Sequence, residues 1–203
     1  QQQTIRALLD AGCVPVVTRE TELSRTLSLL SEPPALVVTD SQAFGIVSKI
    51  VPESVRLTSF SILFARYKGD LRTTVLGAAA LRRLKGGDTV LISEGCTHHR
   101  QCGDIGTEKL PRWVKSYTGR DVNFAFTSGG EFPDDLSPYA LVIHCGACML
   151  NEREMQSRLC RAAEQSVPIT NYGIAIAQLH GILDRALRPF SALHAEWSAQ
   201  QLV

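Results

Sequence analysis

Two short apolar runs, each followed by a cluster of cysteine and histidine, constrain this sequence more than any other feature. The run at 89–92 (Thr-Val-Leu-Ile) leads to the cluster at 96–98 (Cys-Thr-His), and the run at 140–143 (Ala-Leu-Val-Ile) leads to 144–148 (His-Cys-Gly-Ala-Cys). Each run has the length and character of a buried strand. If both strands belong to one parallel sheet, their carboxyl ends lie side by side, where open α/β sheets place their ligands. The sequence therefore predicts a metal site built from two loops.

The candidate ligands are of two kinds. We predict Cys96, Cys145 and Cys148 as metal ligands, and His98 and His144 as residues that bind a cofactor. Thiolates are soft ligands that suit iron–sulfur clusters, zinc or copper(I). These residues could also supply a closed tetrahedral zinc site with one ligand to spare. Ligand chemistry alone therefore supports a zinc site and an iron–sulfur cluster about equally.

Strand-like and helix-like segments alternate along the rest of the chain. Apolar runs predict further strands at 13–17, 35–38, 55–58, 122–126 and 167–170. A short loop cannot return a parallel strand, so this alternation predicts parallel pairing. We therefore expect an α/β fold of two small domains, each a mainly parallel sheet flanked by helices, with a boundary between 1–69 and 70–203.

The second half of the chain carries two clear helix signals. Asn151 stands three residues before Glu154, as in a capping box, and predicts a helix whose free N–H groups point back towards the second cluster. The leucines and isoleucine at 176, 179, 183 and 187 predict one closing helix. Residues from Ser191 onward are predicted to be a loosely held tail.

The spacing Cys-x-His, 45 residues, His-Cys-x-x-Cys resembles the iron–sulfur signature of the HydF family, the FeFe-hydrogenase maturation GTPases. Further segments resemble the same family at 36–42, 94–99, 104–106, 111–113 and 170–173. The resemblance covers nearly the whole chain, and the five-residue pattern is far more specific than a lone Cys-x-x-Cys. The chain departs from the family in having no Gly-x-x-x-x-Gly-Lys-Ser/Thr loop, and it starts at Gln1 without Met. We therefore expect the dimerisation and cluster-binding portions alone.

The resemblance implies a function and partners. It makes 1–69 a dimerisation domain, truncated at its N-terminus, and 70–203 an iron–sulfur cluster-binding domain. It implies that this chain is not an enzyme but a scaffold or carrier, which binds a 4Fe-4S cluster and delivers a transiently held di-iron subcluster precursor. The implied partners are apo-FeFe-hydrogenase, the radical maturation enzymes and further copies of the chain. An unpaired sheet edge in the small unit 1–69 also favours a homodimer or higher oligomer.

Two other classes of function fit the same cysteines. A structural zinc module would be distinguished by metal analysis and by the absence of a brown colour. A thiol–disulfide oxidoreductase would use Cys145 and Cys148, but it leaves Cys96 without a role. That second alternative therefore explains less of the pattern.

The remaining cysteines and the two histidines have more than one interpretation. Cys13 and Cys160 lie in a predicted strand and a predicted helix, so we expect small buried hydrophobes. Cys102 lies outside the family spacing but could fold back as a fourth thiolate. His98 and His144 could each bind iron, bind a second metal unit, or form a hydrogen bond to a ligand sulfur.

Composition excludes several classes of partner. The net charge is +1, and scattered Lys and Arg leave no basic footprint for nucleic acid. No apolar run approaches the roughly 20 residues that cross a bilayer, and no signal segment opens the chain, so we expect no membrane association. Six cysteines without a secretory signal favour metal or redox use in a reducing compartment, so we predict a cytoplasmic location.

Overall fold

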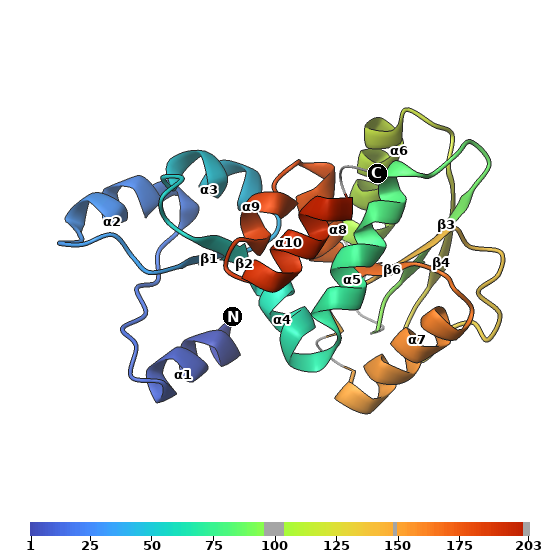
Figure 1. The fold of residues 1–203 in the computed structure, drawn as a ribbon, viewed down its shortest axis with the longest axis horizontal. Helices are drawn as coiled ribbons and strands as arrows, with labels where there is room; N and C mark the ends of the chain where they lie inside the picture. The colour runs from blue at the N-terminus through green and yellow to red at the C-terminus, as the bar shows by residue number, and fades with distance from the viewer. Residues whose placement is uncertain (96–103, 148–149, 201–203) are drawn as a thin grey trace.

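The chain folds into two parallel β-sheets with helices around and between them (Figure 1). The computed structural model describes residues 1–95, 104–147 and 150–200. The predicted α/β class, with two small parallel sheets flanked by helices, is confirmed. The elements in chain order are α1 (Gln2–Asp10), the 3-10 helix η1 (Glu20–Glu22), α2 (Leu23–Leu29), β1 (Val37–Thr39), α3 (Phe44–Ile50), β2 (Leu57–Ser59), α4 (Phe60–Lys68), α5 (Leu71–Gly77), the 3-10 helix η2 (Ala78–Arg82), β3 (Thr89–Ser93), the π-helix η3 (Ile105–Lys109), α6 (Leu110–Thr118), β4 (Asn123–Thr127), β5 (Leu141–His144), α7 (Glu152–Glu164), β6 (Ile169–Asn171), α8 (Tyr172–Leu179), α9 (Leu183–Leu187) and α10 (Ser191–Gln200).

The larger sheet has the strand order β4-β3-β5-β6, and all of its pairs are parallel. Side chains of successive strand residues point to opposite faces. Leu91 and Val142 accordingly pack with α7 on one face, while Ile92 and Ile143 pack with α6 and α8 on the other. Because both faces are covered, residues 90–92 and 141–143 of its two central strands are all buried and apolar.

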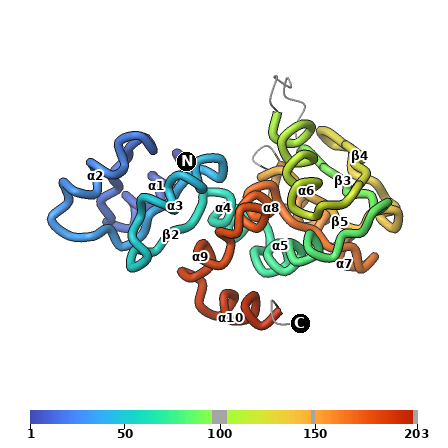
Figure 2. Tube along the Cα trace, turned by 90° about the horizontal axis from the view of Figure 1, so that it is seen from above, coloured from blue at the N-terminus to red at the C-terminus, as the bar shows by residue number. Residues whose placement is uncertain are grey.

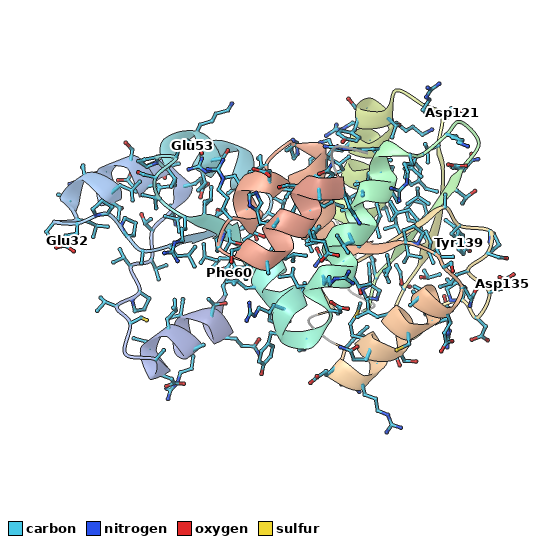
Figure 3. The ribbon with its side chains drawn as sticks, in the orientation of Figure 1. Glu32, Glu53, Phe60, Asp121, Asp135 and Tyr139 are labelled. Carbon is cyan, nitrogen blue, oxygen red and sulfur yellow. The ribbon has the colours of Figure 1, made fainter. Side chains whose placement is uncertain are left out.

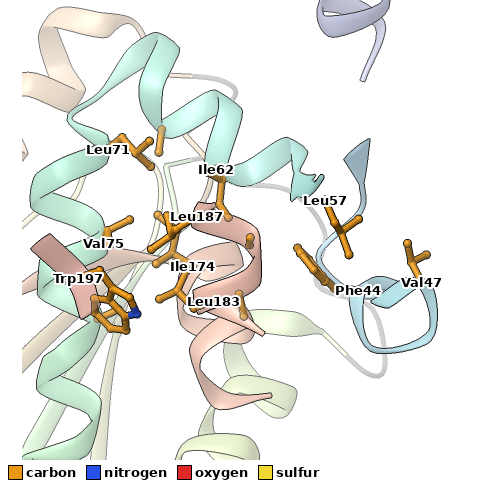
Figure 4. Close-up of a cluster of buried hydrophobic side chains, with 14 of the residues drawn as sticks. Phe44, Val47, Leu57, Ile62, Leu71, Val75, Ile174, Leu183, Leu187 and Trp197 are labelled. Atoms are coloured by element: carbon orange, nitrogen blue, oxygen red, sulfur yellow. The ribbon is translucent and has the colours of Figure 1, made fainter. Parts of the chain in front are cut away.

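The smaller sheet pairs β1 with β2 in parallel, with Val37 opposite Leu57. Its apolar core does not end at the predicted boundary. Helices α8 and α9 lie between the two sheets (Figure 2), and Leu187 and Trp197 belong to the same buried cluster as Phe44 and Leu57 (Figure 4). The boundary after Gly69 stays a prediction, and the two portions share this core.

The C-terminal segment is more ordered than predicted. The predicted closing helix is two helices, α8 and α9, because Gly181 between them has a φ of +70°, in the left-handed region that ends a helix. The predicted loose tail is instead helix α10, whose Trp197 is only 2% exposed. Arg188 of the segment after α9 forms an ion pair with Glu53, which is labelled in Figure 3 on the N-terminal half of the molecule.

The N-terminal arm, residues 1–19, differs most from the prediction. The arm begins with helix α1, none of whose residues is buried, and Figure 1 shows it standing apart from the rest of the chain. The strand predicted at 13–17 is wrong, since this segment has no regular structure. Val14 and Val17 are 90% and 73% exposed. A strand needs a neighbouring strand for its backbone hydrogen bonds, and the described part of the chain pairs only β1 with β2 in this region.

Candidate metal centre

Strands β3 and β5 end at the same level, as predicted. Ser93 lies opposite His144, and the N–H of Cys145 donates a 2.8 Å hydrogen bond to the carbonyl oxygen of Ser93. Glu94 and Gly95 therefore continue beside Cys145 at the carboxyl edge of the sheet. The prediction that the two apolar runs pair in parallel with adjacent ends is confirmed.

Among the described residues, the backbone N–H groups of Gly95 and Ala147 donate hydrogen bonds to the sulfur of Cys145. The N–H of Gly95 lies 3.0 Å from Sγ, and the N–H of Ala147 lies 3.4 Å from it. The donors come from both strand ends, so the sheet itself positions them. Two N–H groups directed at one sulfur favour a negatively charged thiolate, the form that binds metal. The surroundings of Cys145 thus fit a metal or cluster ligand.

A left-handed residue supplies the second of these N–H groups. Ala147 has a φ of +53° and is nearly buried. This conformation costs a residue with a Cβ on the order of 1 kcal/mol or more. The chain turns at this residue, immediately after the N–H that contacts the sulfur two residues earlier. The loop after β5 is therefore strained at the residue whose N–H contacts the thiolate.

The imidazole of His144 is fully buried and has partners at both nitrogens. Nδ1 lies 2.8 Å from the carbonyl oxygen of Cys145, and Nε2 lies 3.0 Å from Nη1 of Arg158. Burial lowers the pKa of His144 from 6.5 to about 4, and the charge of Arg158 acts in the same direction. The ring is therefore neutral at physiological pH.

Arg158 is a buried cation, 1% exposed, that sequence reasoning did not single out. Its Nε donates to a carboxylate oxygen of Glu154 at 2.9 Å, and its Nη2 donates to the carbonyl oxygen of Gly129 at 3.1 Å. The guanidinium also stacks 5.0 Å from the ring centre of Phe132. One signal could have revealed it: Arg158 is spaced three residues after Met155 and four before Ala162, on the face of α7 that packs into the core.

A buried carboxylate lies on the other strand end. Glu94 is 3% exposed and accepts a 3.3 Å hydrogen bond from the hydroxyl of Tyr172. Burial raises the pKa of Tyr172, and the Glu94 carboxylate acts in the same direction, so the hydroxyl stays a donor. A Cβ on Gly106 would lie 2.3 Å from that hydroxyl, which shows how closely η3 approaches the pair. The sequence prediction assigned Glu94 no role, although a carboxylate two residues before a candidate ligand is a signal.

Helix α7 begins directly beyond the second cluster. Asn151 accepts a 2.8 Å hydrogen bond from the N–H of Glu154, so the predicted N-cap is confirmed. The preceding residue, Leu150, packs against the end of β3, since a Cβ on Gly95 would lie 2.7 Å from its side chain. Lys68 at the end of α4 donates to the carbonyl oxygen of Leu150. The start of α7 is thereby held against both β3 and α4.

Three of the five predicted site residues, Cys96, His98 and Cys148, lie outside the described residues, as does Cys102. Their roles stay predictions. Within residues 1–95, 104–147 and 150–200, no three His, Cys, Asp or Glu side chains are grouped to hold a metal ion. Of the predicted set, the structure therefore places Cys145 and His144 only, side by side at the end of β5.

The expectation of buried structural cysteines is wrong. Cys13 and Cys160 are both exposed, the first because the arm forms no strand and the second because it lies on the outer face of α7. Neither lies at the carboxyl edge of the larger sheet. Their exposure leaves them suited as controls for the candidate ligands.

Comparison with known families assigns both parts of the chain. A family model described as the hydrogen maturase F dimerization domain matches residues 1–69, and one described as the hydrogen maturase F tetramerization domain matches residues 72–189. No curated protein matches the chain. The two family matches together cover most of the sequence and agree with the resemblance in its cysteine and histidine spacing. The chain belongs to the HydF family of hydrogenase maturation proteins, of which it carries the dimerization and tetramerization domains.

Proposed function

We propose that this chain is a scaffold and carrier in FeFe-hydrogenase maturation. It binds a 4Fe-4S cluster through Cys96, Cys145 and Cys148 and delivers a di-iron subcluster precursor to apo-hydrogenase. Membership of the HydF family supports a part in hydrogenase maturation. The observation that carries cluster binding is the Cys145 sulfur, which accepts two N–H groups at the carboxyl edge of a parallel sheet.

The residues around Cys145 suit an anionic cluster. The N–H groups of Gly95 and Ala147 stabilise the thiolate, and α7 presents its positive N-terminal end three residues beyond Cys148. A 4Fe-4S cluster with three thiolates supplies one iron whose fourth ligand is replaceable, the place where a di-iron precursor can attach. His98 remains a candidate for that fourth position.

The proposal assigns no catalytic residue to this chain. The partners are apo-FeFe-hydrogenase, the radical maturation enzymes and further copies of the chain, and the two family descriptions support self-association. Ligand thiolates require a reducing compartment, so the proposal places the chain in the cytoplasm. Among the described residues, no helix combines the length and the apolar character needed to cross a bilayer.

Metal analysis of the anaerobically reconstituted chain tests the proposal. We expect about four iron and four sulfide per chain, a brown colour, and an EPR signal on reduction. A colourless chain with about one zinc and no sulfide would establish the structural zinc module instead. A reversible disulfide in a chain without bound metal would establish the thiol redox protein.

A further inference from the structure

His144 stands one residue before a proposed ligand, yet its two nitrogens are engaged within the chain. A guanidinium has only N–H donors, so Nε2 must accept the 3.0 Å bond from Arg158. The proton of the neutral ring is then on Nδ1, which donates to the carbonyl oxygen of Cys145 at 2.8 Å. Neither nitrogen keeps a lone pair for a metal ion.

Arg158 makes it unfavourable for His144 to give up these hydrogen bonds and bind a metal ion. Its guanidinium is nearly inaccessible and is held by Glu154, Gly129 and the ring of Phe132 as well as by His144. If His144 turned towards a metal, Nη1 of this buried cation would lose its acceptor. A buried charged donor without a partner is strongly unfavourable.

The bond to the Cys145 carbonyl acts on the ligand loop itself. That carbonyl belongs to the peptide joining Cys145 to Gly146, and the next residue is the left-handed Ala147. Holding the carbonyl in one orientation fixes the rotation of this peptide plane. The next peptide, which carries the N–H of Ala147, continues from this fixed plane, and that N–H lies 3.4 Å from the Cys145 sulfur.

We propose that His144 is a positioning residue and not a ligand: together with Arg158 it locks the peptide after Cys145, so that the thiolate meets the cluster in one fixed orientation. The idea rests on the proposed function, because it takes Cys145 as a cluster ligand. Outer residues that orient a metal ligand typically change metal affinity 10–100-fold when they are substituted. We therefore expect His144 to govern how fast the cluster is lost.

The test compares four variants of the whole chain: His144→Ala, His144→Asn, Arg158→Met and Arg185→Met. Asparagine keeps an N–H near the position of Nδ1 but is a poor iron ligand, so it separates positioning from ligation. Arg185 is the matched control, because it is a second buried arginine whose partners, the carbonyls of Ser48 and Val51, lie in the other core. The measurements are the rate of iron release to a chelator and the ¹⁴N coupling of the reduced cluster in pulsed EPR.

We expect His144→Ala and Arg158→Met to release iron about tenfold faster than wild type. His144→Asn keeps a donor to the Cys145 carbonyl but loses the acceptor for Arg158, so it should release iron more slowly than His144→Ala, and Arg185→Met should not change the rate. The ¹⁴N coupling should be the same in all of them. A strong ¹⁴N coupling that is present in wild type and Arg158→Met but lost in both His144 variants would overturn the proposal. So would an unchanged release rate in His144→Ala.

Amide hydrogen exchange in the metal-free chain separates this inference from the proposed function. If wild type binds no iron or sulfide, the proposed function fails, and the exchange rate of the Ala147 N–H decides the role of His144. Faster exchange in His144→Ala, slowed again in His144→Asn, supports positioning. Equal exchange in wild type and both variants contradicts it.

Discussion

At the scale of single residues, the surroundings of its sulfur distinguish Cys145 from Cys13 and Cys160. Cys145 lies at the end of a buried strand with two N–H donors on its sulfur, whereas Cys13 and Cys160 are exposed. A cluster held by three thiolates loses an iron ligand when any one of them is removed. An exposed thiol that binds nothing can be removed with little effect.

Cys145→Ala should therefore abolish stable cluster binding, whereas Cys160→Ala should keep full iron and sulfide content. Cys160→Ala should also change the free energy of unfolding by no more than about 0.5 kcal/mol, because the side chain is exposed. Iron and sulfide analysis after anaerobic reconstitution measures the first effect, and urea denaturation the second. Wild-type iron content in Cys145→Ala would refute the ligand assignment.

The fourth ligand of the cluster should be replaceable. Three cysteines at family spacing leave one iron with a weaker ligand, such as His98, a carboxylate or water. Added imidazole or cyanide should therefore shift the EPR signal of the reduced, reconstituted chain, and Cys102→Ala should respond in the same way. If neither imidazole nor cyanide changed the wild-type EPR spectrum while both changed that of Cys102→Ala, the site would be a closed four-cysteine site. That result would contradict the carrier mechanism.

At the scale of secondary structure, close packing of helices on the larger sheet holds its strands in place. Helix α5 ends at Gly77 against β6, where a Cβ on Gly77 would lie 2.0 Å from the carbonyl oxygen of Ile169. The backbone of the larger sheet cannot shift to make room for an added Cβ as a flexible side chain can. Gly45 in α3 offers the opposite case, since its Cβ would meet nothing within 4 Å.

Gly77→Ala should lower the free energy of unfolding by several kcal/mol, because the helix must move off the sheet. Gly45→Ala should leave it unchanged or raise it by up to about 1 kcal/mol, since alanine is the better helix former. Both changes add the same methyl group to a helix, so urea denaturation compares them directly. Equal stability of the two variants would show that α5 does not pack against β6 as described.

At the scale of the whole molecule, the N-terminal arm has an apolar surface that its own chain leaves exposed. Val14, Val16 and Val17 are all more than half exposed, and α1 buries no residue. The arm lies within the residues matched by the dimerization domain. A second copy of the chain that covers the arm would bury these valines. If it also covers an edge of the β1–β2 sheet, it would give hydrogen-bond partners to the backbone groups at that edge.

We therefore expect the wild-type chain to self-associate, and Val14→Asp with Val17→Asp to shift it towards monomer, because buried carboxylates are costly. Sedimentation velocity at tens of micromolar (on the order of the concentration at which weak contacts persist) measures the change. Leu29→Asp is the control, since Leu29 is a 74% exposed residue of the same domain outside the arm. A monomeric wild type, or an arm variant that associates as wild type does, would contradict this role of the arm.

Local patterns in the sequence determined the parallel strands, the N-cap at Asn151 and the meeting of β3 and β5 beneath Cys145, because strand character and capping depend on residues close in the chain. The tertiary structure decided whatever needed a distant partner. Residues 13–17 have strand composition but no neighbouring strand, and α10 is held by a core that begins more than a hundred residues earlier. The sequence predicts His144 as a cofactor-binding residue, and only the tertiary structure places Arg158, fourteen residues on, against its second nitrogen. The sequence determines which chemical groups a side chain carries, but the tertiary structure determines which partners those groups contact.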